Sequence, residues 1–246
     1  MGFDKQLFAG KTILVSGAGK GIGLACAAMA AKYGAQVIAV ARTQADLDKL
    51  ISLYPHSITG WAMDVTSDEF YQRLHSLPVL HGLVNNAGIN RVGPMLDQSG
   101  ENIDAVIDLN IRTLYKISQA AIKPMLKTDG ASIVNMSSQM GFVGSPNRTL
   151  YCMSKHAVEG LTKAMAVELA ENNIRVNTVA PTFVLTPMTE PMFEDAEFKK
   201  FVYDMIPLGK LCGVDDVAHS CTFLLSDLAA MITGTCIKVD GGWTAR

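Results

Sequence analysis

Short apolar runs rich in β-branched residues alternate along the chain with longer amphipathic stretches. The short runs are typical of buried strands, and the longer stretches repeat apolar residues at helical spacing. The pattern predicts strands at residues 12–16, 36–40, 59–63, 82–85, 132–136, 175–179 and 236–239. It predicts helices at residues 21–33, 44–53, 67–74, 103–126, 150–171 and 214–225.

This alternation indicates an α/β fold with a doubly wound, seven-stranded parallel sheet, in which ligands bind at the carboxyl ends of the strands. No repeat, low-complexity tract or composition break divides the 246 residues, so we expect a single domain. Residues 181–213 interrupt the alternation with four prolines and several aromatic residues. We expect a substrate lobe or lid at about residues 182–213, or alternatively a surface insertion.

A glycine-rich turn at residues 16–23 separates the first strand from the first helix. Glycines permit positive φ and let a pyrophosphate approach the backbone amides and the helix N-terminus. The spacing is Gly-x-x-x-Gly-x-Gly rather than the commoner Gly-x-Gly-x-x-Gly. The turn predicts a dinucleotide site formed by Gly17, Gly19, Lys20, Gly21, Ile22 and Gly23.

The end of the second strand indicates which dinucleotide binds. A 2′-hydroxyl is usually recognised by a carboxylate there and a 2′-phosphate by a cation. The sequence has Arg42 and Thr43 and no carboxylate, and Lys20 is a second cation. Because arginine can bind phosphate bidentately, we expect NADP(H). If Arg42 is an ordinary solvated residue, NAD(H) is the cofactor.

Tyr151 and Lys155 are four residues apart in a predicted helix, so their side chains share one face. An ammonium near a phenol favours the phenolate and lowers the phenol's pKa toward the range of a general acid or base. The same spacing also occurs by chance between surface residues. The pair is therefore a candidate catalytic site only in combination with other residues.

Two further polar residues are candidates. Ser138 follows an apolar strand, where its hydroxyl could bind a substrate oxygen, or could simply cap a turn. Asn110 falls on the apolar face of its helix, and a buried amide must be hydrogen-bonded. Either a structural backbone partner satisfies Asn110, or the residue holds a water that links Lys155 to solvent.

Composition excludes several function classes. The formal charge of −2 and the lack of basic runs argue against nucleic-acid partners. Five widely spaced cysteines without a C-x-x-C motif suggest neither a disulfide framework nor a metal site and fit a reducing cytoplasm. Residues 1–11 lack a signal-peptide core, and the longest apolar stretch, residues 24–31, is too short to span a membrane.

Together these motifs resemble the short-chain dehydrogenase/reductase family in its compact, Rossmann-like form. The resemblance rests on the 16–23 loop, Asp64-Val65, Asn85-Asn86-Ala87-Gly88, Asn110, Ser138, Tyr151-x-x-x-Lys155 and Val239-Asp240-Gly241-Gly242. It implies that Asn110, Ser138, Tyr151 and Lys155 form a catalytic tetrad. It also implies cofactor contacts from Asp64, Val65, Asn86, Ala87, Gly88, Tyr151, Lys155, Pro181, Val184 and Thr186.

The chain departs from the family pattern at two positions, where Ser16 replaces the usual threonine and Thr182 the usual glycine. Residues 42–47, Ser138-Gln139 and Tyr151-Cys152 look most like the xylulose and dicarbonyl reductase branch, which uses NADPH. The family is usually homotetrameric, with the helices of Asn110 and Tyr151 packing against their symmetry mates.

These observations predict a reductase of a small carbonyl compound: a ketose, a sugar-derived ketone or a dicarbonyl. Candidate substrate contacts are Gln139, Arg148, Met188 and Phe193, although Arg148 could be a solvated loop residue and the apolar side chains plain core. Alternatives are a 3-oxoacyl-acyl-carrier-protein reductase, an NAD-dependent sugar or sugar-acid alcohol dehydrogenase, and a non-catalytic dinucleotide sensor. Residues 186–205 have an excess of three negative charges, which would repel an acidic carrier protein.

Overall fold

The computed structural model describes residues 2–245 and contains one parallel sheet of seven strands. The strand order is β3-β2-β1-β4-β5-β6-β7. The strands are β1 (Thr12–Ser16), β2 (Gln36–Ala41), β3 (Ile58–Ala62), β4 (Gly82–Asn85), β5 (Ala131–Met136), β6 (Ile174–Pro181) and β7 (Cys236–Val239). The predicted fold and all seven strands are confirmed, with ends that differ from the predicted ones by at most two residues.

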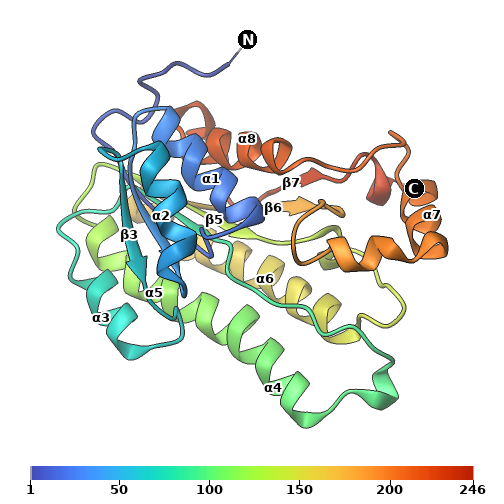
Figure 1. Cartoon of the computed structure of the whole chain (residues 1–246). Coiled ribbons are helices and arrows are strands. Elements are labelled where there is room, and N and C mark those ends of the chain that lie inside the picture. The colour runs from blue at the N-terminus through green and yellow to red at the C-terminus, as the bar shows by residue number, and fades with distance from the viewer. Residues whose placement is uncertain (1, 246) are drawn as a thin grey trace.

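Helices cover both faces of the sheet, as Figure 1 shows. One face is covered by α1 (Gly21–Lys32), α2 (Gln44–Leu53) and α8 (Val214–Leu225), whose side chains form one apolar core with the sheet. The other face is covered by α3 (Asp68–His75), α5 (Leu114–Met125) and α6 (Thr149–Glu168), which form a second core. Apolar side chains on both faces of the strands explain their continuous apolar runs.

From the central strand β1, the chain adds β2 and β3 on one side of the sheet. It then crosses to the other side of β1, where it adds β4 to β7. A ligand crevice is expected where these two directions diverge, at the carboxyl ends of β1 and β4. Ser16 joins these ends, because its hydroxyl donates to the Val84 carbonyl at 3.2 Å and accepts from the backbone N–H groups of Asn86 and Ala87 at 3.0 and 3.2 Å. The hydroxyl that serine shares with threonine therefore has a structural role here.

The helix predicted over 103–126 is present as one continuous helical run, but its start and its internal geometry differ from the prediction. Helix α4 (Gly100–Ile107) starts earlier because the Ser99 hydroxyl accepts from the Asn102 N–H at 3.2 Å, and a π-helix (Asp108–Thr113) separates α4 from α5. The π-helix inserts one residue into the turn that contains Asn110. Apolar periodicity cannot reveal a single added residue, and such insertions often lie at functional sites.

The sequence pattern assigns no helix or strand to the lobe, and the structure corrects this. It contains a 3-10 turn (Glu190–Glu194) and α7 (Ala196–Met205), whose first amides donate to the Asp195 carboxylate. Its aromatic side chains pack together, with Phe183 5.4 Å from Phe198 and 5.8 Å from Trp243 between ring centroids. The lobe thus has a small apolar core of its own beside the sheet.

Candidate active site

The glycine turn has the backbone geometry that the sequence predicts. Gly17 and Gly21 have φ values of +67° and +56°, which side chains rarely adopt. A Cβ on Gly23 would lie 2.2 Å from the Gly17 carbonyl oxygen and 2.4 Å from Asn86 Nδ2, so only glycine fits. No side chain caps the N-terminus of α1. Its first amides therefore remain available to an anion.

A cleft of about 680 Å³ opens beside this turn, within the roughly 300–1,000 Å³ of typical ligand sites. It is lined by most residues predicted to bind the cofactor: Gly17, Gly19, Lys20, Gly21, Ile22, Arg42, Thr43, Asp64, Val65, Asn86, Ala87, Gly88 and Thr186. Gly21 and Thr186 face each other, because a Cβ on Gly21 would lie 3.1 Å from Thr186 Cγ2. The base of the lobe therefore closes over the glycine turn.

No motif in the sequence indicates the rest of this lining, which includes Asp46, Met63, Thr66, Ile89, Arg91, Asp108, Leu109 and Pro187. Asp46 forms an ion pair with Lys20 at 3.5 Å, so Lys20 is already partnered. Arg42 and Arg91 line the cleft without an ion pair to any residue in 2–245. Arg42 is exposed at the end of β2, where a 2′-phosphate could reach it.

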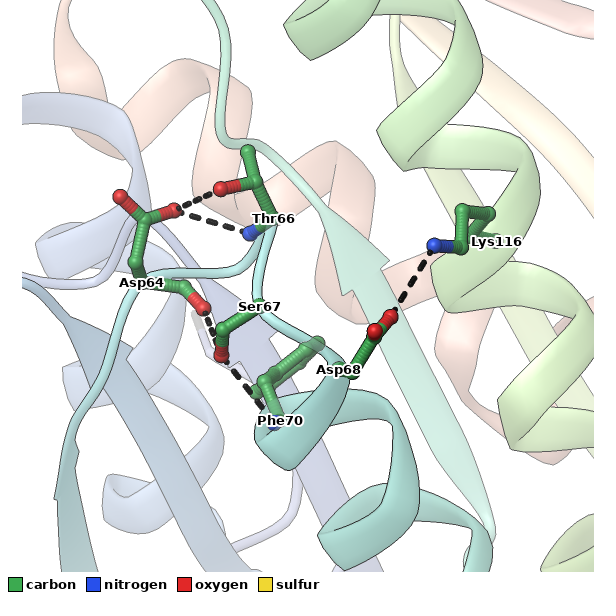
Figure 2. A network of polar contacts seen from close by, with 6 residues as sticks. All are labelled: Asp64, Thr66, Ser67, Asp68, Phe70 and Lys116. Atoms are coloured by element: carbon green, nitrogen blue, oxygen red, sulfur yellow. Dashed lines mark hydrogen bonds and ion pairs between the residues drawn. The ribbon is translucent and has the colours of Figure 1, made fainter.

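A polar network holds Asp64 after β3 (Figure 2). One carboxylate oxygen accepts from the Thr66 backbone N–H at 2.8 Å and from the Thr66 hydroxyl at 2.7 Å. The Asp64 carbonyl accepts from the Ser67 hydroxyl, which also caps the first turn of α3 at the Phe70 N–H. The Thr66 backbone bond lowers the pKa of Asp64, so the side chain is an oriented carboxylate at the cleft wall.

Asn110 is buried, and its amide is satisfied by protein groups. Its Nδ2 donates to the Ile89 carbonyl at 2.8 Å and to the Ser154 hydroxyl at 3.1 Å, and its Oδ1 accepts from the Ile89 N–H at 2.9 Å. These contacts match the structural alternative. These hydrogen bonds connect the π-helix to Ile89 in the cleft wall and to Ser154 of α6. Ser154 is the residue before Lys155.

Lys155 and Tyr151 lie on the first turns of α6. The Lys155 ammonium is buried, lies 5.4 Å from the Tyr151 ring centroid and donates to the Met136 carbonyl at 2.7 Å. Burial lowers the pKa of Lys155 to about 8, although the charge of Glu159 acts in the opposite direction. The pair is therefore no chance match between surface residues.

The expectation that the pKa of Tyr151 is lowered is wrong for this structure. Burial raises the pKa of Tyr151 to about 12, although a hydrogen bond with Ser138 and the charge of Arg148 oppose the increase. The loss of hydration outweighs the nearby charges because a buried phenolate is poorly solvated. At neutral pH the side chain is a neutral phenol that can donate a proton.

Ser138 follows β5 and lies within hydrogen-bonding reach of Tyr151. Its hydroxyl donates to Gln139 Oε1 at 2.7 Å and accepts from the Met140 N–H at 3.2 Å. The serine therefore caps the short turn that follows β5 and also faces the Tyr151 phenol. Gln139 is buried beside it and orients its hydroxyl.

The remaining predicted contacts lie in different places. Met188 is exposed and lines the cofactor cleft, whereas Phe193 packs edge-on against Phe183 at 6.1 Å in the core of the lobe. Pro181 and Val184 are buried at the base of the lobe. The alternative that Arg148 is a solvated loop residue is wrong, because its side chain is buried.

Within residues 2–245, no helix combines the length and hydropathy that a membrane span requires. The described residues also contain no cluster of three or more histidine, cysteine, aspartate or glutamate side chains that could hold a metal ion.

Comparisons with known proteins cover nearly the whole chain. A family model described as enoyl-(acyl carrier protein) reductase matches residues 17–244. The L-xylulose reductase of Bos taurus is 40% identical over 238 residues, which cover 96% of this chain and 98% of the relative. The 3-oxoacyl-acyl-carrier-protein reductase of Thermotoga maritima is 39% identical over 241 residues, which cover 95% and 97%.

Solved structures share the fold. The gluconate 5-dehydrogenase of Burkholderia cenocepacia, crystallised with NADP and tartrate, superposes with a TM-score of 0.92 at 26% identity. The match covers 98% of this chain and 99% of that one.

Proposed function

The chain belongs to the short-chain dehydrogenase/reductase family of NAD(P)-dependent oxidoreductases, and we propose that it uses NADP(H) to reduce a small carbonyl compound to an alcohol. The compound is a ketose, a sugar-derived ketone or a dicarbonyl. One observation carries this proposal: the protonated Tyr151 phenol lies beside Lys155 and Ser138. Asn110 joins their site to the cleft around the glycine turn, because it bonds both Ser154 of α6 and Ile89 of the cleft wall. The L-xylulose reductase relative supports the substrate class.

The cleft fits a dinucleotide phosphate. The uncapped amides of α1 and the glycine turn suit its pyrophosphate, and the free carboxylate oxygen of Asp64 suits the adenine amino group. Arg42 has no competing ion pair among the described residues and suits a 2′-phosphate. The NADP-bound relative from Burkholderia cenocepacia supports the same preference.

Reduction requires hydride at the carbonyl carbon and a proton at its oxygen. The nicotinamide of NADPH supplies the hydride. Tyr151 supplies the proton, because its phenol is neutral at physiological pH. The Ser138 hydroxyl, when it turns from Gln139, donates a hydrogen bond to the same oxygen as negative charge develops.

Lys155 stabilises the phenolate that Tyr151 becomes after it has lost its proton. Its ammonium is held near the ring by the Met136 carbonyl. A positive charge in a buried site acts more strongly than in water, because little solvent screens it. Asn110 keeps the adjacent turn of α6 in register through Ser154, and we propose that it also orders a water on the path from Lys155 to solvent.

The test is a screen of NADPH and NADH oxidation at 340 nm with ketoses, vicinal diketones, sugar-derived keto acids and 3-oxoacyl esters. We expect turnover of a ketose, ketone or diketone, with NADPH preferred. Stoichiometric NADPH binding without reduction of any carbonyl would contradict the proposal and favour a dinucleotide sensor.

Replacement of Tyr151 by phenylalanine tests the mechanism. We expect kcat to fall about 10²- to 10⁴-fold while NADPH affinity stays within about threefold, because the ring remains and only the proton donor is lost. The matched control is Tyr115→Phe on the exposed side of α5, which should change neither quantity. Retained turnover in Tyr151→Phe would show that another group donates the proton.

A second candidate function is reduction of 3-oxoacyl groups on a carrier protein. The family model and the relative from Thermotoga maritima favour it. The surface of the lobe opposes it, since Glu190, Glu194, Asp195 and Glu197 are exposed and would repel an acidic carrier. Efficient turnover of a carrier-bound 3-oxoacyl group, faster than that of any free ketone, would establish this alternative.

We also propose a cytoplasmic homotetramer. Exposed apolar side chains on α5 and α6 support helix-to-helix packing between subunits, among them Tyr115, Met153 and Val167, and Leu126 extends this surface at the end of α5. Light scattering coupled to size exclusion should give four times the subunit mass of 26.4 kDa.

A further inference from the structure

Arg148 precedes α6 by one residue and lies three residues before Tyr151. Its side chain is only 4% exposed. The preceding residue, Asn147, adopts a left-handed φ of 61°, and its carbonyl accepts from the Gly93 N–H at 2.9 Å. The loop is therefore fixed by backbone contacts, and it presents Arg148 and Tyr151 on the same side of the first turn of α6.

The Arg148 guanidinium is a buried cation without an anion. Its Nη1 has no hydrogen-bond partner, and its Nη2 makes only a weak bond to Met192 Sδ at 3.6 Å. No carboxylate within residues 2–245 forms an ion pair with it. A buried unpaired charge is costly, so such a group is expected to have a partner in the working state of the protein.

Aromatic contacts hold the guanidinium but do not satisfy it. Its central carbon lies 5.6 Å from the Phe183 ring centroid and 5.5 Å from that of Phe198. Ring faces attract a cation, yet they offer no lone pair to an in-plane N–H. These contacts fix the orientation of the planar group between α6 and the lobe, and Nη1 remains unbonded.

We propose that Arg148 binds a carboxylate of the substrate, so that the preferred substrate is a small keto acid. The inference rests on the proposed function, since it assumes that a carbonyl is reduced at Tyr151. A carboxylate matches the planar fork of arginine through two parallel N–H bonds. With the carboxylate at Arg148, the ketone of the same molecule is held at Tyr151 and Ser138.

The electrostatic link between the two residues agrees with this placement. The positive charge of Arg148 acts on the Tyr151 phenol and favours its ionised form. A bound carboxylate neutralises that charge, and the phenol carries its proton at neutral pH in either case. A keto acid thus supplies both the missing anion and the proton acceptor.

The test compares each keto acid with its methyl ester, because the two differ only in the charged group. The probes are 2-oxopropanoate, 4-oxopentanoate and 5-oxogluconate, assayed with NADPH at 340 nm. We expect kcat/KM of the unmodified protein to favour at least one acid over its ester by about tenfold or more, as removal of one partner of a buried charged pair does.

Arg148→Met preserves an apolar side chain against the two rings and removes the charge. We expect it to abolish the preference for the acid, mainly through KM, and Arg148→Lys to restore part of it. The matched control is Lys199→Met, which removes an exposed charge from α7 and should leave the ratio of acid to ester unchanged.

The outcomes separate this inference from the proposed function. If ketoses or diketones are reduced but no acid is favoured over its ester, Arg148 is a structural residue and the inference is wrong. The same conclusion follows if Arg148→Met keeps the preference. If no carbonyl is reduced at all, the proposed function fails and the inference fails with it. Since the preference is measured first on the unmodified protein, misfolding of a variant does not affect the test.

Discussion

The burial of Lys155 should destabilise the cofactor-free protein. Its side chain is 7% exposed, and burial lowers its pKa from 10.5 to about 8. A pKa difference of this size corresponds to a penalty of about 3 kcal/mol. We therefore expect Lys155→Met to increase the free energy of unfolding at pH 7 while it abolishes turnover, because the charge that we propose for catalysis is held at a cost in stability.

The expected gain in unfolding free energy is smaller than the full cost of burying the charge of Lys155. The substitution also leaves the Met136 carbonyl without the donor that it has at 2.7 Å, which costs about 1 kcal/mol. The net gain is about 2 kcal/mol. Below pH 8 the lysine is protonated in both states and the penalty is complete. Between pH 8 and 10.5 the unfolded state binds more protons, so the stability of the unmodified protein rises with pH and the advantage of the variant disappears.

The assay is urea unfolding of the cofactor-free protein, followed by circular dichroism at several pH values from 7 to 10. Lys163→Met, an exposed position on the same helix, is the control and should show no pH-dependent difference from the unmodified protein. The reasoning is refuted if Lys155→Met is less stable at pH 7, or if its stability difference is the same at pH 7 and 10.

Three further predictions concern the cleft and its walls. Arg42→Ala should raise KM for NADPH about 10- to 100-fold and leave KM for NADH unchanged, because only the 2′-phosphate loses a charged hydrogen bond. Gly23→Ala should abolish cofactor binding measured by NADPH fluorescence, since the new Cβ would lie 2.2 Å from the Gly17 carbonyl oxygen. The control is Gly160→Ala, whose new Cβ would meet nothing within 4 Å and should be tolerated. Asn110→Ala should destabilise the protein by about 2 kcal/mol in urea unfolding, because both backbone groups of Ile89 lose their partner.

Each of these predictions has a contradicting result. An equal loss of affinity for both cofactors would place Arg42 away from the 2′-phosphate. Normal NADPH binding by Gly23→Ala would mean that the turn relaxes without cost. Unchanged stability of Asn110→Ala would mean that water replaces the amide at Ile89.

The sequence determined the seven strands, the glycine turn and the pairing of Tyr151 with Lys155. These features are local or periodic: a buried parallel strand needs a continuous apolar run, a tight turn needs glycine, and residues four apart share a helix face. The π-helix at Asn110 and helix α7 escaped sequence reasoning. The first adds a single residue to a turn, and the second is amphipathic only toward the small core of the lobe.

Only the tertiary structure decided which polar side chains are buried and which ion pairs and contacts they form. Asp46 belongs to the second predicted helix, yet it lies against the glycine turn and pairs with Lys20 of that turn. Arg148 reads as a loop arginine in the sequence but is enclosed by Phe183 and Phe198 of the lobe. The pKa of Tyr151 is raised rather than lowered for the same reason, because hydration depends on what covers a side chain, and the covering residues come from distant parts of the chain.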